Sequence, residues 1–531
     1  GDFVYKDNFI KKNSDDADVS GAYDEEGNQV VDEFEKNSDS NGRFHTDWLN
    51  MIYPRLKVAR DLLTEDGVIF ISIDEHEVEN IKKIIVEIFG NLNYIGTLII
   101  QTATDNNPGQ IKMEHEYILC ACKNKNNLKN WEVKNESAKY IQEEYNRLKQ
   151  LYNSDTESIQ VELRKFIKKN LTLLKGIAHY DNVDKQGVFH DGDIANTRFG
   201  GYEYDIIHPI TGKVCKMPEK GYRFPKETMK EMLENDNILF GADETTLPKP
   251  KIRIEDAKDR LRSVIYEDGR SSTKRFEKLM ARDIFQNPKS DTIIARLIDF
   301  ICDDDDLVLD FFSGSGTTAE AVFNLGAKQK HLRFIMVQLP EDLDISIKTT
   351  TNKAKKTIKN AIDFLDSIHK EHLISEIGKE RIRRAGYKIK EGHPDWKVDT
   401  GFRVLKLDCS NMKNVFYTPA ATTEQTLFAD NIKPDRKDED LLFQVMMELG
   451  IELSDKIEKI ELAGKTVWNV SEGYLMACFE PNVGEDTITA IAKQQPEYFV
   501  MADRSLASDN VADNFEQIFN EYSESTIRRI I

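Results

Sequence analysis

Long apolar stretches are absent from this chain of 531 residues. None approaches the roughly 20 apolar residues that a membrane-spanning helix needs, and the first residues lack the pattern of a secretory signal. With 40% apolar and 31% charged residues, the composition is that of a globular protein with roughly two to four domains. We therefore expect a cytoplasmic protein that makes no contact with a membrane.

Cysteine is scarce as well. The chain has six cysteines, and only Cys120 and Cys122 lie close together in the sequence. These two alternate on a strand-like segment, and no second pair of Cys or His residues follows at the spacing of a zinc site. The sequence predicts reduced thiols in the protein core and no metal.

The chain also lacks a net positive charge, since it has 73 Lys and Arg residues against 93 Asp and Glu residues. The formal net charge of −20 argues against a protein that coats nucleic acid without specificity. DNA binding requires only a local basic face, and residues 249–289 are enriched in Lys and Arg. The candidate phosphate contacts in this segment are Arg253, Arg260, Arg262, Lys274 and Arg275. An ordinary solvated charged surface is the alternative interpretation.

What the chain does contain is a strand, a glycine turn and a helix over residues 307–325. An apolar strand starts at Leu307 and ends at Asp310, Gly314 and Gly316 form the turn, and helix formers follow from Thr318. Such a corner binds phosphate or adenosine groups in doubly wound α/β proteins. A plain connection with loop glycines is the alternative, since isolated motif matches are often false.

The surrounding segments predict an α/β fold. We expect strands at 68–73, 94–100, 115–122 and 334–338, and helices at 78–89 and 292–302. The continuous apolar run 68–73 is typical of a strand in the middle of a parallel sheet. Glu341 follows the strand after the glycine corner, where adenosine-type ligands have their ribose hydroxyls bound. Its separation from Asp310, about 30 residues instead of about 20, disfavours a hydride-transferring dinucleotide enzyme.

Several motifs resemble those of amino-group DNA methyltransferases. The segment Asp310-Phe-Phe-Ser-Gly-Ser-Gly-Thr-Thr resembles their S-adenosylmethionine motif, and Phe285-Gln-Asn-Pro-Lys289 is similar to the segment that precedes it in the permuted beta subgroup. Residues 44–56, 67–74 and 114–119 resemble further motifs of that subgroup. Val337-Gln-Leu-Pro-Glu341 and residues 401–407 resemble the modification subunits of type III restriction-modification systems in particular.

This resemblance implies a Rossmann-like, doubly wound S-adenosylmethionine-dependent methyltransferase core with two additions. The core comprises residues 1–135 and 281–342, interrupted by a target-recognition insert at 136–280. A helical connector at 343–400 leads to a C-terminal α/β assembly domain at 401–531. We expect the connector and the C-terminal domain to contact partner subunits.

The resemblance also implies the residues that bind S-adenosyl-L-methionine. The backbone of residues 312–316 approaches its methionine part, Asp310 faces its amino group, and Glu341 is its ribose partner. Thr317 and Thr318 cap the helix, Gln338 fills the adjoining position, and Phe285 and Lys289 cover the pocket. The full set is Asp310, Phe311, Phe312, Ser313, Gly314, Ser315, Gly316, Thr317, Thr318, Gln338, Glu341, Phe285 and Lys289.

The implied reaction is methylation of the N6 amino group of adenine in duplex DNA. The family holds the flipped base with an Asp-Pro-Pro-Tyr motif, and this chain has no Pro-Pro dipeptide. We therefore assign no catalytic residue and expect the chain to start just downstream of its catalytic loop and to be incomplete for catalysis alone. The alternative is a DNA-recognition and assembly scaffold without activity. The implied partners are double-stranded DNA, a second copy in a homodimer and a separate helicase-nuclease subunit.

Overall fold

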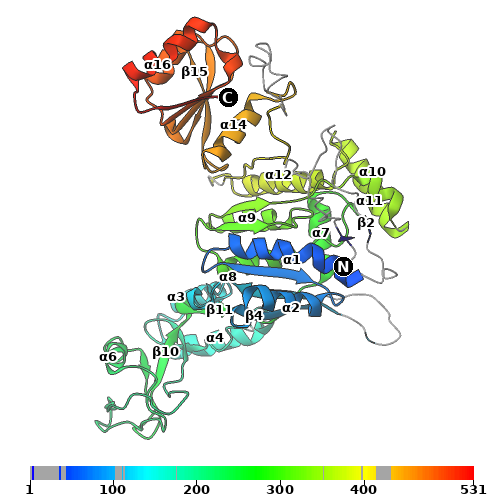
Figure 1. Ribbon diagram of the computed structural model, residues 1–531. Helices are drawn as coiled ribbons and strands as arrows, with labels where there is room; N and C mark the ends of the chain where they lie inside the picture. The colour runs from blue at the N-terminus through cyan, green and yellow to red at the C-terminus, as the bar shows by residue number, and fades with distance from the viewer. Residues whose placement is uncertain are drawn as a thin grey trace. The chain divides into compact units, whose positions relative to one another are not determined.

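The computed structural model describes residues 3–4, 35–36, 44–101, 111, 114–174, 176–350, 352–395, 399–413 and 432–531 (Figure 1). These residues form two compact units, of which one ends at Thr400 and the other comprises Gly401–Ile531. Each unit contains helices and sheets, so the predicted α/β class is confirmed. No helix in these ranges combines the length and apolar character required to cross a membrane.

The core sheet of the first unit has the strand order β12-β4-β5-β3. Its strands are β3 (Val68–Ile73), β4 (Tyr94–Gln101), β5 (His115–Cys122) and β12 (Val264–Tyr266). The helices α1 (Phe44–Leu62) and α2 (Val78–Phe89) pack on it through Leu56, Ile81 and Ile85, which meet Leu119 and Ala121. The strand β12 falls within the range predicted for the insert, yet it pairs with β4 in parallel.

The prediction that residues 68–73 lie in the middle of a parallel sheet was wrong. The neighbouring strand β5 runs antiparallel to β3, with Val68 opposite Cys122. Among the described residues, no strand pairs with the other edge of β3. An apolar run therefore predicted the strand itself, whereas its place and direction depend on which distant segment it meets.

The glycine corner lies on a separate two-stranded parallel sheet of β13 (Leu307–Asp310) and β14 (Arg333–Met336). The helices α8 (Asp291–Ile301) and α9 (Thr317–Gly326) cover one face, where Val308 and Phe334 pack against a cluster centred on Ala321 and Val322. The opposite face exposes Leu307 by 50% and Ile335 by 47%. The predicted strand is therefore confirmed, but it is buried on one face only.

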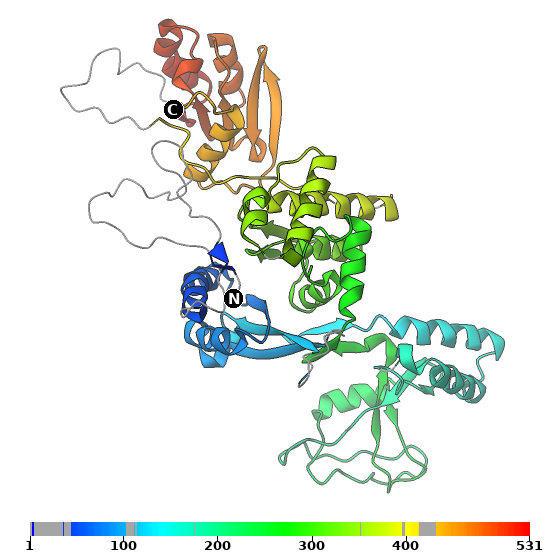
Figure 2. The same ribbon diagram turned by 90° about the vertical axis from the view of Figure 1, so that its right-hand side faces the viewer.

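The segment between β5 and β12 folds into helices and small sheets of its own (Figure 2). It also has its own hydrophobic clusters. It begins with the small strand β6 (Glu132–Lys134), which pairs with β11 (Lys258–Arg260). The helices α3 (Ala138–Leu151), α4 (Thr156–Lys169) and α5 (Leu171–Leu174) form one cluster with a sheet of order β7-β8-β10-β9. The strands of that sheet are Asn182–Val183, Val188–Asp191, Lys249–Arg253 and Ile238–Leu239, and the helix α6 (Lys226–Glu234) packs in the second cluster.

Four helices pack against one another next to the glycine corner. They are α7 (Gly269–Leu279), α10 (Leu343–Thr349), α11 (Asn352–Ser367) and α12 (Ile374–Gly392). Phe276, Leu343, Leu365 and Ile377 meet in one buried cluster. The connector helices are therefore packed into the unit that contains the corner.

The second unit is built around a five-stranded sheet of order β15-β16-β17-β18-β19. Its strands are Ile457–Leu462, Lys465–Val470, Leu475–Cys478, Tyr498–Met501 and Ile527–Ile530. In β17, Leu475 and Ala477 face the cluster of α14 (Asp438–Glu448), while Met476 and Cys478 face that of α15 (Glu485–Ala492) and α16 (Asp509–Tyr522). Helices on both faces explain why this central strand reads as continuously apolar.

Candidate functional site

The glycine turn between β13 and α9 requires glycine at two positions. Gly314 has φ +50° and Gly316 has φ +75°, a region that residues with a Cβ rarely adopt. The turn is tied to β14, because Ser313 N donates to Val337 O at 3.1 Å and Val337 N donates to Asp310 O at 2.8 Å. The backbone of the turn is therefore held in one conformation that its sequence permits.

Asp310 binds the turn with both carboxylate oxygens. Its Oδ1 accepts from Phe312 N at 3.1 Å, and its Oδ2 accepts from the Thr318 hydroxyl at 2.6 Å. The prediction that Thr317 and Thr318 cap α9 was wrong, because Gly316 is the N-cap residue and makes no side-chain cap. The two threonines are instead the first residues of the helix and bind other partners.

Gln338 and Glu341, the two predicted residues that follow β14, differ in their contacts. Gln338 Oε1 accepts a hydrogen bond from Gly314 N at 2.8 Å, so its amide braces the turn. Glu341 Oε1 accepts from Ser346 Oγ at 2.6 Å. Burial raises the pKa of the Glu341 carboxyl, and this hydrogen bond from Ser346 only partly offsets the effect.

Four further predicted residues separate into two groups. A Cβ added to Gly314 would lie 3.4 Å from Cζ of Phe285, so this ring is brought to the corner. Phe312 is 42% exposed beside the turn. Lys289, by contrast, forms an ion pair with Glu116 of β5, and Phe311 packs against the core of α1, α2 and β3. Lys289 therefore binds outside the corner, whereas Phe311 contacts both that core and Phe312, at a ring-centroid distance of 5.1 Å.

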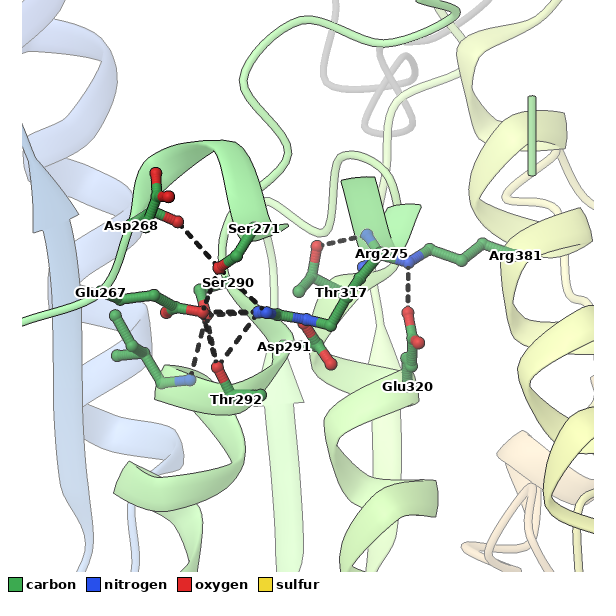
Figure 3. Close-up of polar contacts among 11 residues, drawn as sticks. Glu267, Asp268, Ser271, Arg275, Ser290, Asp291, Thr292, Thr317, Glu320 and Arg381 are labelled. Carbon is green, nitrogen blue, oxygen red and sulfur yellow. Dashed lines mark hydrogen bonds and ion pairs between the residues drawn. The ribbon is translucent and has the colours of Figure 1, made fainter. Parts of the chain in front are cut away.

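A buried arginine that the sequence analysis missed holds the turn from α12 (Figure 3). Arg381 is 2% exposed, and its Nε donates to Glu320 Oε2 at 2.8 Å. Its Nη1 donates to Ser315 Oγ at 2.7 Å and to Thr317 Oγ1 at 2.6 Å. We call these four residues the Arg381 clamp. Its signal in the sequence was the helical spacing of Ile377, Arg381 and Ala385, which places the arginine on the apolar face.

The backbone of α12 also lies close to the backbone of the glycine turn. A Cβ on Gly378 would meet the carbonyl oxygen of Gly314 at 3.1 Å, and one on Gly316 would meet the carbonyl oxygen of Gly378 at 3.0 Å. Both distances are tighter than ordinary van der Waals contact. Gly378 therefore lets α12 lie directly against the turn.

Most of the arginines proposed as phosphate contacts serve the fold. Arg253 pairs with Asp184, and Arg260 pairs with Glu132. Arg275 of α7 donates to Glu267 at 2.6 Å and to Asp291 at 2.8 Å, which joins the end of β12 to the start of α8 (Figure 3). Of the five candidates, Arg260, Arg262 and Lys274 are exposed.

The class of the protein follows from a family comparison. Residues 11–352 match the DNA methylase family that modifies N6 or N4 amino groups. This range covers more than half of the chain and includes the glycine corner. The chain is thus a DNA methylase of the N6/N4 class.

Relatives narrow the class further. The chain is 34% identical over 529 residues to the Mod subunit of the type III restriction-modification enzyme EcoP15I of Escherichia coli, covering 97% of this chain and 75% of that one. It is 27% identical to the EcoPI Mod subunit of Escherichia phage P1, covering 93% of this chain and 72% of the relative. The chain therefore belongs to the family of Mod subunits of type III restriction-modification enzymes.

Among solved structures, this chain is similar to a DNA modification methylase of Thermus thermophilus in complex with S-adenosyl-L-methionine. It is 12% identical, covers 59% of this chain and 79% of its own, and has a TM-score of 0.23. The α/β fold is therefore assigned from the strand orders and helix packing described above.

The geometry of the turn predicts how alanine acts at Gly316. Gly316→Ala adds the strain of a positive φ and the contact with Gly378, whereas Gly212→Ala adds a similar φ of +67° in open space. We expect Gly212→Ala to lower the free energy of unfolding by about 1–2 kcal/mol and Gly316→Ala to lower it by more. Urea denaturation of both variants measures this difference. Equal losses would show that α12 does not press on the turn.

Proposed function

We propose that this chain binds S-adenosyl-L-methionine at the glycine corner, and that it is the modification subunit of an enzyme that methylates N6 of adenine in duplex DNA. The observation that carries the proposal is the turn with two left-handed glycines between β13 and α9, in which Phe312 is exposed and Ser313 and Gly314 are partly exposed. When bound, S-adenosylmethionine supplies an electrophilic methyl group that the lone pair of adenine N6 takes from sulfur, while the amine loses a proton and S-adenosylhomocysteine remains.

The residues at the corner fit this cofactor. The backbone of residues 312–314 is exposed or partly exposed, and a Cβ at Gly314 would crowd the space next to Phe285. Asp310 already accepts two hydrogen bonds, but a carboxylate has about four acceptor sites, so it retains capacity for an amino group. Glu341 offers a carboxylate to ribose hydroxyls. Phe285 contributes an aromatic wall over Gly314.

The substrate side of the proposal rests on the family. The exocyclic amine of a base is stacked inside the duplex, so a methylase that acts on it must extrude the base. N6 of adenine is the assignment that the resemblance to type III modification subunits favours. From the same resemblance we propose a homodimer and a separate helicase-nuclease subunit as partner. The relatives are named as Mod subunits of restriction-modification enzymes, which supports a separate restriction subunit.

Within the range assigned to the insert, DNA contact is proposed for one face of α7. Arg270, Lys274 and Lys278 recur every four residues of α7 and are exposed, while Arg275 and Phe276 face inward. In a chain with a net charge of −20, a basic stripe on the helix whose end leads to Phe285 is a suitable phosphate-contacting surface.

Cofactor binding gives the direct test. Gly314→Val places a branched side chain at a positive φ and against Phe285, so we expect isothermal titration calorimetry to detect no binding of S-adenosylmethionine. The control is Gly96→Val, since Gly96 lies in β4 with open space around its Cβ position. Unchanged affinity in Gly314→Val would contradict the assignment of the corner.

Glu341 predicts a pH dependence. Its raised pKa means that ionisation costs stability as pH rises through the folded-state pKa, so Glu341→Gln should be more stable than wild type at neutral pH. The same variant should bind S-adenosylmethionine more weakly at neutral pH and lose the fall in affinity that wild type shows as pH is lowered. Urea denaturation and calorimetry across pH measure both. A variant with higher stability and unchanged affinity would remove Glu341 from the site.

The basic stripe predicts a salt effect. Lys274→Ala/Lys278→Ala should weaken binding to duplex DNA of any sequence and reduce the slope of log affinity against log salt by up to about 2. Fluorescence anisotropy at several salt concentrations measures this slope. Lys82→Ala/Lys83→Ala, on the exposed side of α2 outside the insert, is the control with the same change in charge. Equal slopes in the two double variants would reject the α7 face.

A further inference from the structure

We propose that Arg381 is a positioning residue for the cofactor: from α12 it holds the turn of residues 314–317 in the shape that receives S-adenosylmethionine. This inference rests on the proposed function, because it concerns the same corner. It adds to the site a helix that the sequence assigned to a connector, and a residue that lies 61 positions after Glu320, its ion-pair partner.

The hydrogen bonds of Arg381 fix both sides of the left-handed glycine. Ser315 and Thr317 flank Gly316, and one nitrogen of Arg381, Nη1, donates to both hydroxyls. The planar guanidinium is oriented by Glu320, which accepts from Nε. Rotation of the turn about Gly316 would therefore break at least one of these charge-assisted bonds.

Burial indicates that Arg381 acts through the turn and not on a ligand. The side chain is 2% exposed, and the ring centroid of Phe276 lies 5.0 Å from its guanidinium carbon. The positive end of the α9 dipole would repel this cation, and the carboxylate of Glu320 in the first turn of α9 compensates it. The pair is therefore neutral overall and is not built to attract an anion.

A role in folding alone is the competing explanation, and the physics of buried ion pairs separates the two. Removing one partner of such a pair leaves an uncompensated buried charge and strongly destabilises a protein. Replacing both partners by apolar residues of similar volume is often neutral or stabilising. If the clamp only serves folding, an apolar pair will restore every property of the wild type.

The experiment compares Arg381→Met, Glu320→Leu and the double variant in the full chain. Urea denaturation should show both single variants destabilised and the double variant close to wild type. Calorimetry with S-adenosylmethionine should nevertheless find the double variant weaker by about tenfold or more, the size expected for lost hydrogen bonds to a charged group. A double variant that recovers both stability and affinity would overturn the proposal.

Two further variants test the hydroxyl contacts. Ser315→Ala/Thr317→Val keeps the ion pair of Arg381 and Glu320 but removes the two acceptors in the turn, and it should also weaken cofactor binding. Arg381→Lys keeps the charge without the fork of donors, so its affinity should fall between wild type and the double apolar variant. Wild-type affinity in both variants would refute positioning through the hydroxyls.

The remaining control addresses stability in general. Leu163→Ala opens a cavity in the separate core of α3 and α4 and should destabilise the protein without changing its affinity for S-adenosylmethionine. The outcomes also separate the two proposals. Wild-type protein that fails to bind S-adenosylmethionine would overturn the proposed function, whereas binding by wild type and equally by Arg381→Met/Glu320→Leu would overturn the positioning role alone.

Discussion

The buried ion pair between Arg381 and Glu320 is the constraint on which the glycine corner depends. Two charges removed from water are tolerated only when they are paired and their remaining donors are satisfied. Here Ser315 and Thr317 satisfy Nη1, so the pair and the turn must form together. Three residues later on α12, Arg384 donates to the carbonyl oxygens of Leu279 and Met280 and so fixes the end of α7.

This arrangement makes α12 the common support of the site. Its backbone touches the turn at Gly378, its Arg381 orients the residues around Gly316, and its Arg384 anchors the segment that leads to Phe285. On the other side of α7, Arg275 joins Glu267 after β12 to Asp291 at the start of α8. These ion pairs and hydrogen bonds connect segments that are distant in sequence, and they hold the corner in its observed shape.

The sequence predicts the features that local backbone chemistry determines. The strand 68–73 matches β3, the helix 78–89 matches α2, and Gly314 and Gly316 have the positive φ that their turn requires. Pairing between distant segments is not local. The sequence therefore did not predict that β3 is an edge strand among the described residues, or that β13 is buried on one face only. The charged run around Arg381 suggested an exposed connector, although the period of Ile377, Arg381 and Ala385 placed the arginine inward. The ion pairs of Arg253 with Asp184 and of Arg260 with Glu132 could not be predicted, because these acidic partners lie far away in the sequence.

The most direct measurement is amide hydrogen exchange of the full chain with and without S-adenosylmethionine. Ligand binding raises the free energy of opening of the elements that form its site together. If the corner binds the cofactor and the Arg381 clamp supports it, exchange should slow in residues 311–319 and also in residues 374–385 of α12. Protection of the corner without α12, or protection confined to the cores of residues 138–174 or 457–478, would contradict this account.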